Sequence, residues 1–245
     1  MLNLAVVQYK PAFGKVEENL SKVLSMLKYI KEGSIVALPE MWQCGFDYKN
    51  LTNHAERTEE VLEEVKRISL EKNLAIVGTY PLKLKGKIYN SAVFVEKGKV
   101  IGIRHKIKLF PLYEEPKYFA PGIENPVFES FTAKIGILIC FELRFPELSQ
   151  SLREVDILIV PSMWGEKRKE HLKTLSRARA IENQSFLMLS NAWGSVGGEE
   201  YAGHSAIYSP WGEVLAFSEK GDSILQVEVE KEQVQRVREY IPLKS

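Results

Sequence analysis

The stretch KIGILICFELRFPE, residues 134–147, decides the architecture of this chain. An apolar run leads into Cys140, and charged residues then lead to Pro146, a residue that favours the first turn of a helix. The pattern predicts a strand, a sharp turn and a helix. Such an elbow holds a side chain at a sheet edge, close to backbone N–H groups that can bind an oxyanion. A small buried cysteine at a strand end explains this segment equally well.

Outward from this elbow, strand and helix signals alternate along the whole chain. Apolar runs predict strands at residues 2–8, 34–38, 74–80, 89–95, 99–105, 134–140, 155–161, 185–191, 203–209, 213–217 and 223–228. Helical spacing predicts helices at about residues 15–32, 56–72, 147–153, 169–181 and 231–240. This order favours an α/β layered domain with a mixed sheet. Because no linker or repeat interrupts it, we expect residues 1–245 to form one domain.

Composition limits the partners of the chain. Its 245 residues include 33 Lys and Arg and 32 Asp and Glu, a net charge of +1, which is not the footprint of a nucleic-acid binder. No apolar run approaches the roughly 18–20 residues of a membrane helix, and the first residues do not resemble a signal peptide. We therefore expect a cytoplasmic protein that binds neither nucleic acid nor membrane.

Two further segments offer groups that could assist a cysteine nucleophile. Glu40 ends the apolar run IVALPE (residues 35–40), where partial desolvation raises a carboxyl pKa and makes a usable base. Lys106 and Lys108 alternate with apolar residues in IRHKIKLF (103–110), so both are predicted on one strand face. A salt-bridged glutamate and a solvated lysine face are the structural alternatives.

Histidine is the usual base for a cysteine, and the chain has four: His54, His105, His171 and His204. None lies in a compact motif, and each is more typical of a surface or structural role. A Cys–His pair stays open at this point. A metal site is disfavoured, because no Cys or His cluster has ligand spacing.

Taken together, these motifs resemble the nitrilase superfamily of carbon–nitrogen hydrolases. LPEMW (38–42), RHKIKLF (104–110) and CFELRFPE (140–147) follow in that family's order. Three other segments extend the resemblance over most of the chain: EEPKYFAPG (114–122), RARAIENQSF (177–186) and HSAIYSPWGEVLA (204–216). CFELRFPE and RARAIENQ look closest to the omega-amidase-like branch.

The resemblance implies an α-β-β-α sandwich that forms homodimers or larger homo-oligomers, and a Glu–Lys–Cys triad without metal or organic cofactor. By matching position, Cys140 is the nucleophile, Glu40 the general base and Lys106 the cation that holds the oxyanion. A second glutamate is expected before the Pro-Gly pair. Counting back from that pair favours Glu115, while counting forward from Lys106 leaves Glu114 open.

Two departures from the family pattern leave the substrate preference open. The family often has histidine where this chain has Lys108, and aspartate where it has Glu142. Neither departure touches the triad.

The activity implied is hydrolysis of a small-molecule amide to a carboxylic acid and ammonia through a cysteine thioester, on a dicarboxylic acid monoamide. We expect Phe141 and Trp164 to form an apolar wall and Arg168 to pair with the distal carboxylate. A salt bridge from Arg168 to Glu166 or Glu170 is the structural alternative. For Arg144, a structural role in which it braces the elbow through Glu147 or Glu182 is equally open.

Other functions stay open at this level. N-carbamoyl-amine and nitrile hydrolysis belong to the same superfamily. A Cys–His hydrolase or acyltransferase would use Cys140 with His171 or His204, and a non-catalytic interaction module would keep only the fold.

Overall fold

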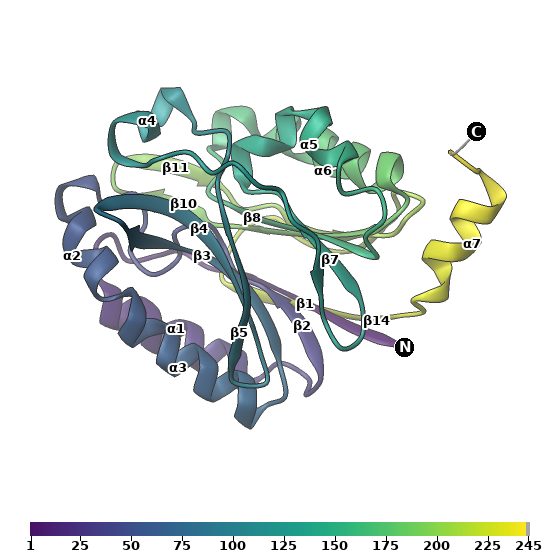
Figure 1. The fold of residues 1–245 in the computed structure, drawn as a ribbon, viewed down its shortest axis with the longest axis horizontal. Coiled ribbons are helices and arrows are strands. Elements are labelled where there is room, and N and C mark those ends of the chain that lie inside the picture. The colour runs from purple at the N-terminus through teal and green to yellow at the C-terminus, as the bar shows by residue number, and fades with distance from the viewer. Residues whose placement is uncertain (244–245) are drawn as a thin grey trace.

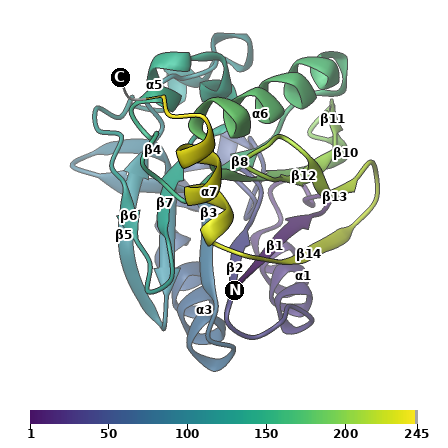
Figure 2. The same ribbon diagram turned by 90° about the vertical axis from the view of Figure 1, so that its right-hand side faces the viewer.

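Two six-stranded sheets pack face to face between layers of helices (Figures 1 and 2). The structure is a computed structural model that describes residues 1–243. Helices on the outer face of the first sheet are α1 (Val16–Lys28) and α3 (Thr58–Glu71), and on that of the second α5 (Pro146–Gln150) and α6 (Lys169–Asn183). The expected α-β-β-α sandwich is confirmed.

Each sheet has three parallel strands at its centre and antiparallel strands at its margins. The first sheet has the order β14 (Ser223–Val229), β1 (Leu2–Gln8), β2 (Ser34–Ala37), β3 (Ala75–Leu84), β4 (Lys87–Glu96), β5 (Lys99–His105). The second has the order β13 (Val214–Ser218), β12 (Ser205–Tyr208), β9 (Phe186–Asn191), β8 (Ile157–Ser162), β7 (Lys134–Ile137), β6 (Phe128–Glu129). The parallel strands are β1, β2 and β3 in one sheet and β7, β8 and β9 in the other.

Alternation along β1 explains why the sheet is covered on both faces. Leu2, Leu4 and Val6 belong to the apolar core between the sheets. Ala5 and Val7 point the other way and belong to a second core with the residues of α1 and α3. Since successive side chains of a strand point to opposite faces, an apolar strand needs two packed partners.

Most predicted elements are confirmed to within a few residues, and the differences lie at chain reversals. The strand expected over 134–140 ends at Ile137, because the chain turns into a short 3-10 helix, Cys140–Arg144. The prediction missed α2 (Leu51–Glu56) and the hairpin β10 (Trp193–Val196) and β11 (Glu199–Ala202). It also missed α4 (Glu115–Tyr118), while α7 (Glu232–Tyr240) is the expected last helix.

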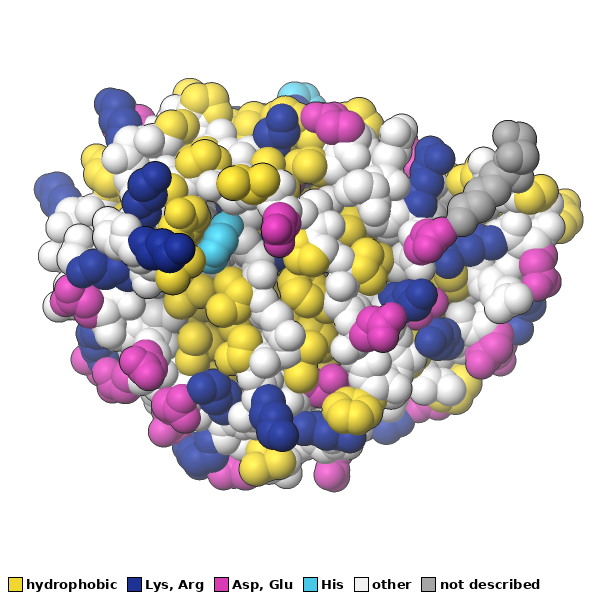
Figure 3. All heavy atoms as spheres, viewed as in Figure 1, with side chains coloured by type: hydrophobic (Ala, Val, Ile, Leu, Met, Phe, Trp, Pro, Cys, Tyr) yellow, Lys and Arg dark blue, Asp and Glu magenta, His cyan; other side chains and the backbone are white. Residues whose placement is uncertain are grey.

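Strand β5 forms one margin of the first sheet and carries partly exposed apolar side chains. Val100, Ile101 and Ile103 are each exposed by about two-fifths, and apolar side chains gather over this edge in Figure 3.

Among residues 1–243, no helix is long and apolar enough to span a membrane.

At this margin β5 packs against the second sheet, and Gly102 makes the contact possible. A Cβ at Gly102 would lie 2.1 Å from Cε1 of Phe128 in β6. We predict that Gly102→Ala lowers the free energy of unfolding by about 1–3 kcal/mol, because the ring must shift within a packed core. Urea unfolding measures this loss. Ile103→Val, at a partly exposed position on the same strand, should change stability by less than about 0.5 kcal/mol, and equal midpoints for all three proteins would contradict the prediction.

Candidate active site

Cys140 lies at the first residue of the elbow, just after β7. Its backbone has a φ of +48°, in the left-handed region. This conformation costs a non-glycine residue about 1–2 kcal/mol and persists only where the surroundings impose it, often at functional sites. The residue is only 6% exposed, so the sulfur is less open than the sequence suggested. Pro146 opens the following helix, as predicted.

Glu40 reaches the same place from the end of β2 and is fully buried. Its Oε1 accepts hydrogen bonds from Lys106 Nζ at 2.7 Å and from Asn90 Nδ2 at 2.8 Å. Its Oε2 accepts one from the backbone N–H of Met163 at 3.1 Å. Three donors thus fix the orientation of the carboxylate.

Lys106 follows β5 directly and is enclosed by two carboxylates. Its Nζ lies 2.7 Å from Glu40 Oε1 and 2.7 Å from Glu115 Oε1, and all three side chains are almost fully buried. Glu115 also accepts a hydrogen bond from the N–H of Phe110 at 2.7 Å. Glu114 is exposed and pairs with Lys117, so geometry favours Glu115 as the second glutamate.

The prediction that Lys106 and Lys108 share a strand face is wrong. Strand β5 ends at His105, so the alternation of a strand does not continue to either lysine. Lys106 is buried, whereas the Lys108 side chain is 37% exposed and lies 4.8 Å from the ring centre of Phe145.

These residues come from different sheets but from equivalent positions in them. Glu40 follows β2, and Cys140 follows β7, while Ser162 ends β8; all three are parallel strands at their carboxyl ends. In α/β proteins, sites form outside the carboxyl ends of parallel strands. Packing the two sheets face to face brings two such edges together.

Charge balance in the cluster sets its protonation. Burial acts to lower the pKa of Lys106, but the Glu115 and Glu40 carboxylates raise it above its usual value, so the ammonium is retained. Burial raises the pKa of Glu115 to about 7, since Lys106 offsets burial only in part and Glu40 adds a second negative charge.

The Cys140 thiol has a pKa well above its usual value. Burial is the largest cause, and the Glu40 carboxylate adds to it, while Lys106 and the nearby Ser162 hydroxyl act in the opposite direction. Cys140 therefore rests as a thiol, and it would need a base in order to act as a nucleophile.

A narrow cavity of about 10 Å³ opens above the sulfur. Its lining residues are Phe110, Cys140, Phe141, Arg144, Met163, Trp164 and Arg168. The three residues expected to bind substrate, Phe141, Trp164 and Arg168, are thus all in its wall.

Both arginines in this wall have partners other than those expected. Arg168 donates to Tyr113 Oη at 2.8 Å and lies 3.9 Å from Glu199 Oε1, so the expected bridge to Glu166 or Glu170 is wrong. Those two glutamates pair with Lys169 and Lys173.

The bracing role expected for Arg144 is also wrong. Its guanidinium lies 4.8 Å from the Trp164 ring centre and its Nη2 lies 3.0 Å from His171 Nδ1. Within residues 1–243, no carboxylate lies within ion-pair distance of it. Burial and the nearby Arg168 lower the pKa of this guanidinium.

Sequence reasoning missed Asn90 and Ser162. Asn90 is a fully buried amide within the apolar strand β4, and Ser162 is a fully buried hydroxyl at the end of β8. The only signal was a polar residue inside an otherwise apolar strand, which also occurs where a side chain simply satisfies the backbone.

Three of the four histidines contact residues outside the Cys140 cavity, and the fourth, His171, contacts Arg144 in its wall. His54 Nε2 lies 2.9 Å from Asp47 Oδ2, and His105 Nδ1 lies 2.7 Å from Ser91 Oγ. The His204 ring lies tilted against that of Phe217, with 5.6 Å between the ring centres. Within the described residues, no group of three His, Cys, Asp or Glu side chains is arranged to hold a metal.

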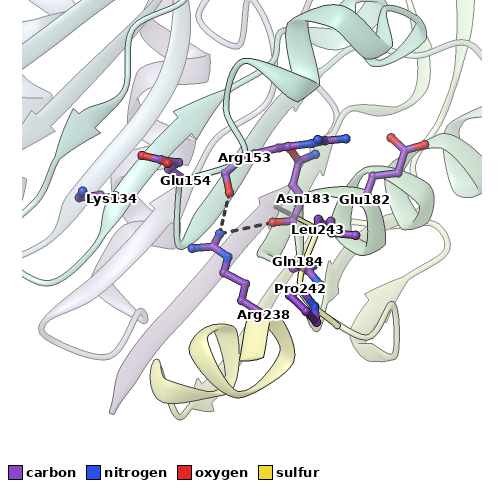
Figure 4. A pocket seen from close by; sticks show the side chains of 9 residues that line it. All are labelled: Lys134, Arg153, Glu154, Glu182, Asn183, Gln184, Arg238, Pro242 and Leu243. Atoms are coloured by element: carbon purple, nitrogen blue, oxygen red, sulfur yellow. Dashed lines mark hydrogen bonds between the residues drawn. The ribbon is translucent and has the colours of Figure 1, made fainter. Parts of the chain in front are cut away.

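A larger cavity, of about 460 Å³, lies beside α7 and away from this cluster (Figure 4). Arg238 crosses its floor and donates to the backbone oxygens of Arg153 and Asn183. It holds neither a cysteine nor the lysine with its two carboxylates, so we place the candidate active site at Cys140.

Comparison with known proteins places the chain in a family. The pattern of the family described as "Carbon-nitrogen hydrolase" matches residues 3–239. Similar proteins include the 2-oxoglutaramate amidase of Bacillus subtilis, 32% identical over 98% of this chain and 95% of that protein. Another is the omega-amidase NIT2 of Xenopus tropicalis, 31% identical over 98% of this chain and 93% of that protein.

Solved structures agree on the fold. XC1258 from Xanthomonas campestris, a CN-hydrolase superfamily protein, superposes with a TM-score of 0.93 at 22% identity, covering 98% of this chain and 95% of that one. Nit3 of Saccharomyces cerevisiae gives 0.91 at 24% identity, covering 100% and 95%. The chain is a carbon–nitrogen hydrolase of the nitrilase superfamily. Within that superfamily it is amidase-like.

The raised pKa of Glu115 predicts how stability depends on pH. Between about pH 4.5, the usual value, and pH 7, the folded protein keeps a proton on Glu115 that the unfolded chain releases. Stability therefore falls as pH rises through this window, because the native state binds more protons. We expect Glu115→Gln to lose less stability than the wild type between pH 5 and pH 8 in urea titrations. Parallel losses in the two proteins would contradict this.

Proposed function

We propose that this chain is a cofactor-free amidase that hydrolyses the amide of a dicarboxylic acid monoamide through a thioester on Cys140. One observation carries the catalytic part. A buried ammonium, Lys106, lies between the carboxylates of Glu40 and Glu115, beside a cysteine at a strained elbow. We propose residues 1–245 as one carbon–nitrogen hydrolase domain.

In the first half-reaction, the Cys140 sulfur attacks the amide carbon while Glu40 takes the thiol proton. The raised thiol pKa makes this coupled transfer necessary, since little free thiolate is present at neutral pH. The carbonyl oxygen becomes an oxyanion. Glu40 then gives its proton to the leaving nitrogen, so that ammonia departs and a thioester remains.

We assign Lys106 and the backbone N–H of Phe141 as the hydrogen-bond donors that stabilise the oxyanion. An ammonium has three N–H donors, and two of those of Lys106 point to Glu40 and Glu115. The third is available for the substrate oxygen. A single donor of this kind contributes about 10²–10³ in rate, or roughly 3–4 kcal/mol.

In the second half-reaction, Glu40 takes a proton from water as the water attacks the thioester. The acid is released, and the proton returns to the Cys140 sulfur. Glu115 orients Lys106 and, when protonated, is a hydrogen-bond donor within the cluster, consistent with its pKa of about 7. Glu40 thus acts alternately as base and acid.

The arginines at the mouth of the cavity support a substrate with a distal carboxylate. Arg144 has no carboxylate partner within the described residues, and Arg168 only a distant one, Glu199, at 3.9 Å. A partly buried guanidinium group without a close counter-charge favours an anion, which it binds with paired hydrogen bonds. The names of the relatives, 2-oxoglutaramate amidase and omega-amidase, agree with such a substrate. N-carbamoyl-amines and nitriles are the alternatives within the superfamily.

Homodimer formation is part of the proposal. Large apolar side chains are exposed around α6 and α7: Ile181, Trp211, Phe217 and Tyr240. The rings of Trp211 and Tyr240 lie 5.7 Å apart, so these two exposed side chains are neighbours. A second copy of the chain would cover them.

Replacement of the nucleophile tests the catalytic proposal. We expect Cys140→Ala to release ammonia from succinamate at no more than the background rate, with an unchanged circular dichroism spectrum. Cys44→Ala is the matched control, since Cys44 is also a buried free cysteine but has no role in the proposed mechanism. This variant should retain activity. Ammonia release by Cys140→Ala at the wild-type rate would end the proposal, and with it the thioester.

Replacement of the arginines tests the substrate class. Arg144→Met should raise KM for succinamate about 10- to 100-fold, equivalent to the roughly 1.5–3 kcal/mol of a charged hydrogen bond. It should leave kcat/KM for butyramide, which lacks the carboxylate, within threefold. Arg168→Met should have a smaller effect, because Tyr113 and Glu199 already engage Arg168.

Arg153→Met, at the other cavity, is the control for loss of a positive charge. If wild-type kcat/KM is the same for succinamate and butyramide, carboxylate recognition is wrong while amide hydrolysis stands.

A further inference from the structure

A second buried carboxylate, Glu142, lies beside the candidate active site and takes no part in the chemistry proposed above. It is fully buried and stands two residues after Cys140. Its Oε2 accepts the backbone N–H of Ile139 at 2.7 Å and Arg104 Nη1 at 2.7 Å. One oxygen therefore binds the residue that directly precedes the nucleophile.

The other oxygen of Glu142 binds the segment that follows Lys106. Oε1 accepts the N–H of Ile107 at 2.6 Å and that of Lys108 at 3.3 Å. A single carboxylate thus joins the backbone next to the cysteine to the backbone next to the lysine.

This link matters because the two segments belong to different sheets. Lys106 continues from β5 of the first sheet, and Cys140 follows β7 of the second. Within residues 1–243 no strand ladder joins the two sheets, so strand pairing does not set the distance from Nζ to the sulfur. The backbone hydrogen bond from the Glu40 N–H to the Ser162 oxygen, 3.3 Å long, joins the sheets elsewhere, and side chains must join the Lys106 and Cys140 segments.

Arg104 makes the bridge electrically neutral. Its side chain is fully buried, its Nη1 pairs with Glu142, and its Nε donates to Asn125 Oδ1 at 2.7 Å. A buried carboxylate without a counter-charge would be strongly destabilising and would add to the negative charge of the Glu40–Glu115 cluster. Arg104 is itself part of β5, so the pair ties that strand directly to the elbow.

We propose that Glu142, held and neutralised by Arg104, is a positioning residue that sets the placement of Lys106 and of the Phe141 N–H relative to the Cys140 sulfur. This inference rests on the proposed function, since it assigns those groups to one oxyanion. Misplacing a reacting group by about 1 Å can cost about 10²-fold in rate. The role is therefore expressed in kcat and not in substrate binding, which the arginines at the cavity mouth control.

Glu142→Gln tests this at 25 °C with succinamate as the substrate. Glutamine has the same shape but presents an N–H₂ group to donors, so it cannot accept all four hydrogen bonds. We expect kcat to fall at least about 100-fold while KM stays within threefold. Acylation of Cys140 by p-nitrophenyl acetate, which needs no carboxylate recognition, should slow in parallel. Thermal melting followed by circular dichroism verifies that the variant is folded at the assay temperature.

Two further variants keep the test decisive if Glu142→Gln does not fold. Glu142→Asp keeps the charge but is one methylene too short to reach both segments, and Arg104→Met removes the counter-charge. Each should lower kcat at least about tenfold with KM nearly constant. The double variant Arg104→Met/Glu142→Gln should fall no further than the worse single variant, as expected for two members of one unit.

Glu147→Gln is the matched control, an exposed glutamate five residues further along the same segment. It should retain wild-type kcat. A lowered melting temperature with kcat and acylation within threefold of wild type would overturn the inference and leave Glu142 a purely structural residue. Full activity of Cys140→Ala would instead overturn the proposed function, so the two failures are distinguishable.

Discussion

The arrangement of this molecule depends on one buried ammonium held between two buried carboxylates. Taking Lys106, Glu40 and Glu115 out of water is costly, and only close pairing and complete hydrogen bonding offset that cost. Each carboxylate therefore receives a further donor, Asn90 for Glu40 and the Phe110 N–H for Glu115. Asn90 is held within strand β4 and Phe110 in the loop after β5, so the cluster joins a strand to the loop that follows Lys106.

The two-sheet sandwich is what makes such a cluster possible. Parallel strands end at one edge of each sheet, and packing the sheets face to face brings two of these edges together in a dry core. One edge contributes the acid and the other the sulfur. Glu40 and Cys140 are a hundred residues apart along the chain. Side chains that cross the boundary between the sheets therefore help to fix the distance between the two edges. The Arg104–Glu142 pair is one such contact, and it is fully buried.

Sequence alone predicted the layered fold well, because apolar strands alternating with amphipathic helices have few alternatives. Glu40 and Cys140 each end an apolar run, where a charge or a thiol is unusual, whereas Lys106 was chosen over Lys108 by the resemblance to the nitrilase superfamily. Periodicity failed just past such an end: Lys108 does not share a face with Lys106, because β5 stops at His105. The partners expected for two partly buried arginines were also wrong. Arg144 and Arg168 choose among many residues that are near in space but distant in sequence, and local spacing carries no information about them.

The presence of glutamate at position 142, where the family pattern often has aspartate, can be understood in these terms. The longer side chain reaches Arg104 on the opposite sheet and still caps the N–H groups on both sides of the boundary. A shorter acid at this position would need the two segments to approach, or a different donor between them. Residue 142 and its counter-charge at 104 should therefore change together among related chains, since either one alone leaves an unpaired buried charge. In our proposal, the departure that seemed to concern substrate preference instead concerns the alignment of Lys106 and the Phe141 N–H with the Cys140 sulfur.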